Sequence, residues 1–179
     1  MGRVKLPNAV GVILGATLAA CGGEIVTSPD ALSIEPFRVA QLRAPQSVAI
    51  SNGLSSPVKY QIRNQSVTWE LDARQLTDTA IVMLQRALDA QGIRAGAQPG
   101  KTVTLRTQVR GGMAMFVPVP TVAASARLTL HADFGDGTAT SVDGENGSGF
   151  GVQGAFEGAI QSALHRLLID PRFLAYINR

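Results

Sequence analysis

The sequence predicts an α+β fold in which an antiparallel sheet carries two main helices packed on one face. Segments 102–110 and 124–132 alternate apolar and polar residues, which predicts half-buried strands. Segments 73–91 and 152–169 carry apolar residues at helical spacing, which predicts two amphipathic helices. This order of strands, helix, strands and helix is typical of helices layered on an antiparallel sheet.

Three short strands are expected before the first helix, at 46–51, 58–62 and 67–71. Residues 63–66 would form the hairpin turn between the second and third of these strands. Trp69 alternates in phase with Leu71, so we expect it to anchor the core of the sheet. A surface contact is the alternative role for this side chain.

The first helix has clear start and stop signals. Asp72 is placed as its N-cap, with Gln75 as the capping-box partner. Gly92 and the apolar Ile93 are typical of a glycine-terminated helix. The expected buried face consists of Leu76, Ala80, Met83, Leu84, Ala87 and Leu88.

The second half of the chain also predicts strands followed by helices. A turn at 135–137 is followed by a polar strand at 138–147, which is expected at the edge of the sheet. After the helix at 152–169, Asp170 and Pro171 predict the N-cap and first residue of a short last helix.

The chain begins with the features of a bacterial lipoprotein signal peptide. Arg3 and Lys5 precede an apolar run at 9–20, which ends in Leu18-Ala19-Ala20-Cys21. This run is shorter than the roughly 20 apolar residues of a transmembrane helix. The four residues resemble a lipobox, which implies that Cys21 receives a diacylglyceryl group and becomes the first mature residue. Ordinary cleavage with Cys21 as a bystander is the alternative.

The predicted organisation has three parts: a signal peptide at 1–20, a lipidated tether at 21–45 and one periplasmic domain at 46–179. The tether has no sustained apolar period and contains several prolines. Two acyl chains suffice for stable anchoring, so the anchor needs no help from the protein surface. Gly22 follows the cysteine, and resemblance to enterobacterial lipoproteins then implies sorting to the outer membrane.

The net charge gives no argument for nucleic-acid binding. The formal charge of +3 falls to +1 without Arg3 and Lys5, since 14 basic and 13 acidic side chains remain. The mature chain has no basic cluster with interleaved aromatic residues, which nucleic-acid recognition would require.

Three patterns resemble chemical sites, but none predicts one. Residues 149–154 match a Gly-x-Gly-x-x-Gly nucleotide-binding string, but a helix and no second strand should follow them. His131 and Asp133 would share a strand face without a third metal ligand. His165 lies on a predicted helix, and no other candidate ligand stands at a metal-binding spacing from it. The acidic residues near the glycine turns lack the EF-hand spacing; they are Asp133, Asp136, Asp143 and Glu145. We therefore expect no enzyme activity, no cofactor and no metal.

Residues 113–120 are wholly apolar and join two predicted strands. Exposed apolar patches tend to mark partner sites. Folding over the sheet, or continuing the hairpin as strand, is the alternative. The residues predicted to contact a partner are Met113, Met115, Phe116 and Val117.

The lipobox, the tether and several core patterns together resemble the YajG-type lipoproteins. The core patterns are at 90–93 (AQGI), 103–105 (VTL), 152–156 (VQGAF) and 170–174 (DPRFL). The resemblance covers residue 46 to the end and implies an envelope lipoprotein without catalytic residues. The apolar segment 113–120 departs from the family's pattern.

We therefore expect a lipid-anchored protein at the periplasmic face of the outer membrane that binds another envelope component, in a structural or assembly role. A domain that binds a small ligand or glycan between sheet and helices is the competing expectation. An enzyme that uses His131 and Asp133 is a more distant one.

Overall fold

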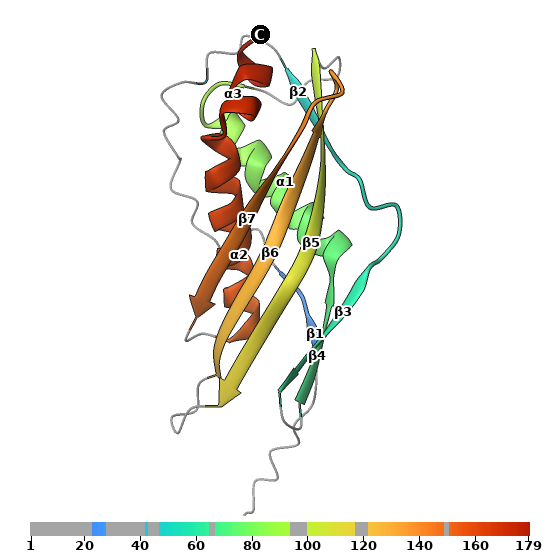
Figure 1. Cartoon of the computed structure of the whole chain (residues 1–179), viewed down its shortest axis with the longest axis vertical. Coiled ribbons are helices and arrows are strands. Elements are labelled where there is room, and N and C mark those ends of the chain that lie inside the picture. Colours follow the sequence, from blue (N-terminus) through green and yellow to red (C-terminus); the bar gives the residue numbers. More distant parts are fainter. Residues whose placement is uncertain are drawn as a thin grey trace, which may run out of the picture.

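The structure is a computed structural model that describes residues 23–27, 42, 47–64, 67–93, 100–116, 122–148 and 151–179. The predicted signal peptide, Cys21 and most of the predicted tether lie outside the described residues. Within them the chain forms seven strands and three helices, which confirms the α+β class (Figure 1).

The larger sheet has four strands in the order β2-β5-β6-β7. Their bounds are β2 Val48–Asn52, β5 Lys101–Phe116, β6 Val122–Phe134 and β7 Ala139–Ser148. The pairs β5–β6 and β6–β7 are antiparallel, and β7 lies at the edge as predicted. β2 pairs with β5 in parallel, which is possible because a long crossover separates them in sequence.

The smaller sheet has three strands in the order β1-β4-β3. β3 (Lys59–Asn64) and β4 (Val67–Asp72) form the expected antiparallel hairpin. β1 (Glu24–Ile25) adds to β4 in parallel. The prediction of one antiparallel sheet is therefore corrected to two mixed sheets, each with one parallel pair.

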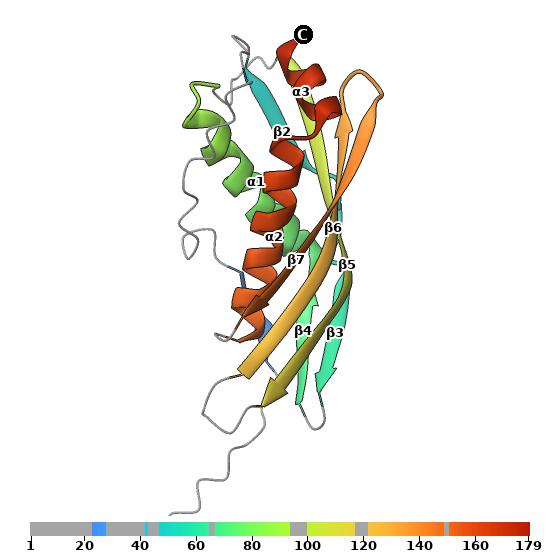
Figure 2. The ribbon, with the colours of Figure 1, turned by 60° about the vertical axis from the view of Figure 1, so that its left-hand side comes forward.

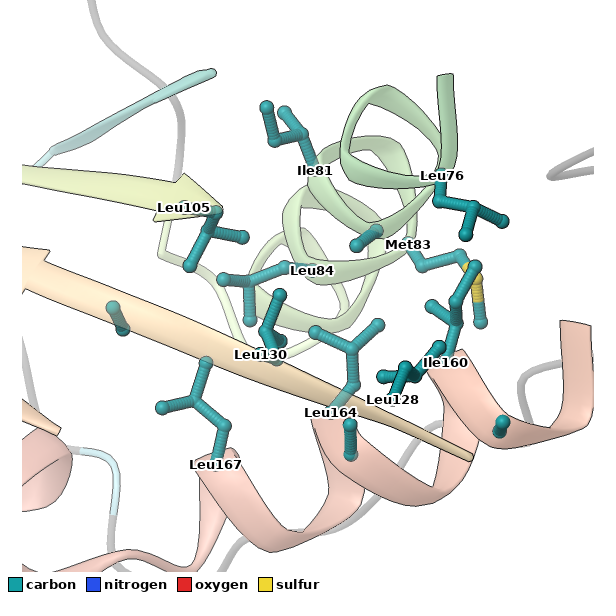
Figure 3. Close-up of a cluster of buried hydrophobic side chains, with 14 of the residues drawn as sticks. Leu76, Ile81, Met83, Leu84, Leu105, Leu128, Leu130, Ile160, Leu164 and Leu167 are labelled. Atoms are coloured by element: carbon teal, nitrogen blue, oxygen red, sulfur yellow. The ribbon is translucent and has the colours of Figure 1, made fainter. Parts of the chain in front are cut away.

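The helices are α1 (Ala73–Asp89), α2 (Val152–Leu168) and α3 (Pro171–Asn178). α1 and α2 lie side by side along the four-stranded sheet (Figure 2). Figure 3 shows the core between them, where side chains of α1, α2 and the central strands point toward one another. The labelled members are fully or almost fully buried: Leu76, Ile81, Met83, Leu84, Leu105, Leu128, Leu130, Ile160, Leu164 and Leu167.

The predicted helix boundaries are confirmed by their hydrogen bonds. The Asp72 carboxylate accepts the Arg74 amide at 2.9 Å, and the Asp170 carboxylate accepts the Arg172 amide at 2.9 Å. Gly92 has a φ of 79°, and the Ile93 amide donates to the Leu88 carbonyl at 3.0 Å. A positive φ favours glycine, which has no Cβ atom to clash with the backbone, so Gly92 is suited to end α1.

The start of the predicted tether differs from expectation. Ile25 is 4% exposed in β1, and the hydroxyls of Thr27 and Thr79 form a buried hydrogen bond of 2.9 Å. Residues 23–27 are therefore part of the packed domain. Backbone hydrogen bonds to β4 and the burial of Ile25 hold this segment in place, although the sequence shows no strand or helix period there.

Candidate binding groove

The side chains on one face of the four-stranded sheet point away from the apolar core and are mostly polar. They come from three adjacent strands and include Arg106, Gln108, Arg110, Arg127, Thr129, His131, Asp133, Ser141, Asp143 and Glu145. The alternation in β5 and β6 predicted this polar face, because successive strand residues point to opposite sides. The opposite phase carries the buried residues Val103, Leu105, Leu128 and Leu130.

Cross-strand contacts connect these polar side chains. Arg106 and Asp133 form an ion pair of 2.6 Å. The Arg110 guanidinium donates to the Thr129 hydroxyl at 2.9 Å, and that hydroxyl donates to the Asp143 carboxylate at 2.7 Å. Such pairs between neighbouring strands stabilise a sheet by tenths of a kcal/mol to ~1 kcal/mol each.

The pairing of β5 with β6 shifts by one residue at a β-bulge between Val109 and Gly111. The groove beside it has a volume of about 740 Å³ and is lined by Arg110, Gly111, Gly112, Ser125, Ala126, Arg127, Glu145, Asn146 and Gly147. Gly111 and Gly147 contribute no side chain, which leaves room above the sheet. We call this hollow the bulge groove.

A second hollow of about 570 Å³ adjoins the bulge groove and shares Arg110, Arg127 and Glu145 with it. Arg166 reaches it from α2 and donates to the Asp143 carbonyl at 3.0 Å. Arg127 and Glu145 lie 3.4 Å apart and have side chains 77% and 60% exposed. A pair this exposed contributes at most about 1 kcal/mol, so either side chain can exchange its partner for a ligand group at little cost.

His131 and Asp133 share the outer face, as the alternation predicted, but each bonds to a different neighbour. The His131 ring nitrogens lie 2.7 Å from the Ser141 hydroxyl and 3.3 Å from the Gln108 amide oxygen. Asp133 bonds to Arg106 instead. No group of three or more His, Cys, Asp and Glu side chains in the described chain could hold a metal ion. His165 lies elsewhere, on α2.

The acidic residues considered for calcium do not converge on one point. Asp136 accepts the Thr138 hydroxyl at 2.6 Å and the Thr138 amide at 3.0 Å. These two hydrogen bonds lower the pKa of Asp136, with Arg179 adding a smaller effect. Asp143 and Glu145 bond to Thr129 and Arg127 on the sheet face. Asp136 therefore stabilises a turn, as acidic residues in turns commonly do.

The described residues of the glycine string at 149–154 belong to the transition from β7 to α2. Gly151 is the N-cap of α2 with a φ of 97°, and the side-chain amide of Asn146 donates to the Gly154 carbonyl at 3.3 Å. After α2 the chain continues into α3, so the βαβ unit of a nucleotide site is not formed here.

The apolar residues predicted to contact a partner lie partly within a strand. The backbone of Met113 to Phe116 forms the end of β5, where Met113 pairs with Ser125 and Phe116 pairs with Val122. Over these residues the chain continues the hairpin, which was the alternative considered from the sequence. Val117 lies outside the described residues, and partner contact by this segment stays a prediction.

The described part of the chain contains no helix that is long and apolar enough to span a membrane. No protein-family profile matches the sequence. No curated protein matches it either. The fold is similar to the crystal structure of a Xanthomonas campestris protein of family DUF330, with a TM-score of 0.41 and 13% sequence identity. That alignment covers 88% of this chain and 95% of the other. The chain thus has a distant structural likeness to a bacterial DUF330 protein, and membership of the YajG-type lipoproteins stays a prediction.

Proposed function

We propose that this protein is a lipid-anchored component of the bacterial envelope whose α+β domain binds another envelope protein and catalyses no reaction. Its anchor would be the acylated Cys21, and its place the periplasmic face of the outer membrane. The lipobox at 18–21 supports the anchor, and the YajG-type core patterns support the class of protein.

The observation that carries the binding role is the bulge groove. It combines a hollow lined in part by glycines with the side chains of Arg127 and Glu145, which are exposed and form only a weak ion pair with each other. The polar groups around it bond to one another across strands, which fits a recognition surface of mixed charge. Rim charges of this kind contribute more to association rate and partner choice than to raw affinity.

Charge reversal in intact cells tests this proposal. We expect Arg127→Glu to reduce recovery of a crosslinked envelope partner at least fivefold, because it sets two carboxylates side by side at the groove. Arg63→Glu is the matched control, since Arg63 is also an exposed strand arginine but lies in β3. Equal recovery from the two variants would contradict binding at the groove.

The predicted contact residues Met113, Met115, Phe116 and Val117 give the same experiment a second arm. A Met115→Ser/Phe116→Ser variant that loses the partner while Arg127→Glu retains it would place the protein contact at the end of β5. Unchanged recovery would remove this segment from the partner interface.

Binding of a small ligand or glycan is the second candidate, and the groove volume of about 740 Å³ favours it. Among the described residues this hollow lies on the sheet face away from the core, and not between sheet and helices as expected. Titration of the purified chain with cell-wall oligosaccharides would separate the candidates, because a glycan site needs no second protein.

A further inference from the structure

We propose that the domain is held against the lipid bilayer in one orientation, with an uncharged end of its main sheet facing the lipid. The uncharged end comprises residues 112–116 of β5, 122–126 of β6 and 146–148 of β7. This inference rests on the proposed lipid anchor at Cys21. It adds which surface of the domain contacts the lipid.

The first step is that the chain is fixed to the domain almost directly after Cys21. The Glu70 amide donates to the Gly23 carbonyl at 3.1 Å, and Glu24 and Ile25 pair with Glu70 and Leu71. Ile25 is buried, so this attachment has an apolar anchor as well as backbone hydrogen bonds.

The second step is a limit on distance. Consecutive Cα atoms are 3.8 Å apart, so the Cα atoms of Cys21 and Gly23 are separated by at most about 8 Å, whatever path Gly22 takes. A free flexible tether of about 25 residues would instead have an end-to-end distance of roughly 25–30 Å. The docked strand β1 thus brings the domain to the membrane surface once Cys21 is acylated.

The third step is direction. β1 is parallel to β4, so Gly23 lies toward the end at which β4 starts and the β3–β4 hairpin turns. Figures 1 and 2 both show the end of β5 and the start of β6 at this same end of the molecule. A Cβ atom built at Gly112 would lie 3.1 Å from the Ile62 side chain, so β5 and the hairpin are in contact here.

The fourth step is the chemistry of this end. No charged residue occurs in the sequence at 111–126 or 146–156, although these stretches supply parts of three adjacent strands. Bringing these strand ends to the membrane interface therefore desolvates no charge of their own, and charges are the costliest groups to bury in lipid. A lipid surface is the occupant we favour, because the anchor itself brings that surface to this end.

Depth-dependent fluorescence quenching tests the orientation. The full lipoprotein is reconstituted into vesicles of phosphatidylethanolamine and phosphatidylglycerol that carry spin-labelled lipids. An environment-sensitive dye is attached through Ser125→Cys at the uncharged end, or through Arg172→Cys on α3. Both residues are exposed, and α3 lies at the opposite end (Figure 1). Acylated Cys21 has no free thiol, so each protein carries one dye.

We expect the dye at 125 to be quenched at least threefold more than the dye at 172. Ile25→Asp, which places a charge in the buried β1 position, should remove this difference. Val26→Asp should preserve it, because Val26 is 52% exposed. Equal quenching at both positions would overturn the proposal.

Mass spectrometry of the same samples separates this inference from the proposed function. A diacylglyceryl-modified Cys21 together with equal quenching would reject the orientation and leave the anchor intact. An unmodified Cys21 would reject both.

Discussion

The hydroxyl of Tyr176 accepts a hydrogen bond from the Thr102 amide at 3.0 Å and donates one to the Thr102 carbonyl at 2.9 Å. The Tyr176 ring stacks on Phe134 with centroids 4.8 Å apart. One side chain of α3 thus satisfies both backbone groups of a residue at the start of β5. The last helix is therefore an integral part of the domain.

Tyr176→Phe should lower the free energy of unfolding by about 0.5–1.5 kcal/mol, because it removes the hydroxyl that bonds to both backbone groups of Thr102 while the ring packing persists. Chemical denaturation measures the change. Tyr60→Phe in β3 is the matched control, since the Tyr60 hydroxyl bonds to none of the described residues. An equal loss in both variants would show that the Thr102 contact contributes nothing specific.

Gly144→Ala should destabilise the chain by about 1–3 kcal/mol or more, since overpacking displaces backbone. A Cβ atom at Gly144 would lie 2.1 Å from the Ala159 carbonyl oxygen, so α2 would have to move away from β7. At Gly147, on the same strand, the nearest such atom is 4.0 Å away. Thermal melts of Gly144→Ala and Gly147→Ala should differ accordingly, and similar melting temperatures would contradict the close packing of α2 on β7.

The buried hydroxyl pair of Thr27 and Thr79 predicts a non-additive response. Thr79→Val should cost about 1–3 kcal/mol, because it leaves the Thr27 hydroxyl buried without a partner. The double variant Thr27→Val/Thr79→Val should recover most of that loss, since two apolar groups replace the pair. Denaturant unfolding of the four proteins gives the coupling energy, and simple additivity would show that residue 27 is not packed on α1.

Asp136 predicts a specific pH dependence. Its pKa is lowered below the ordinary 3.8, chiefly by the hydroxyl and amide of Thr138. A lowered carboxyl pKa contributes stability above pH 3.8, and this contribution is lost as the pH falls through the folded-state pKa. Asp136→Asn should therefore be less stable than the natural chain at pH 7, and the difference should shrink below about pH 4.

Unfolding curves across this pH range measure the effect for Asp136. Thr138→Val removes the hydroxyl donor and should weaken the same pH dependence. A stability difference that stays constant from pH 7 to pH 3 would contradict the assignment to Asp136.

The sequence was most informative where local signals and packing agree. Asp72 and Gly92 set the limits of α1 within a few residues, because capping and positive φ are local requirements. Asp170 and Pro171 located α3 for the same reason. Apolar alternation placed β5 and β6, since one face of each is buried against the helices.

Features that depend on remote pairing could not be predicted. β1 is only two residues long and pairs with residues 46 positions away, so no period marks it. β5 extends to Phe116 because the bulge after Val109 restores its pairing with β6, whereas the alternation in the sequence ends near Arg110. The bulge groove was missed too, since the alignment of Gly111, Arg127 and Glu145 across three strands depends on their register.

The central claim is that Cys21 is an acylated anchor placed directly beside the folded domain. Intact-mass and N-terminal peptide analysis of protein extracted from membranes tests it most directly. We predict a mature chain that begins at Cys21 with a diacylglyceryl group on its sulfur. A soluble product with a free Cys21 thiol would contradict the account.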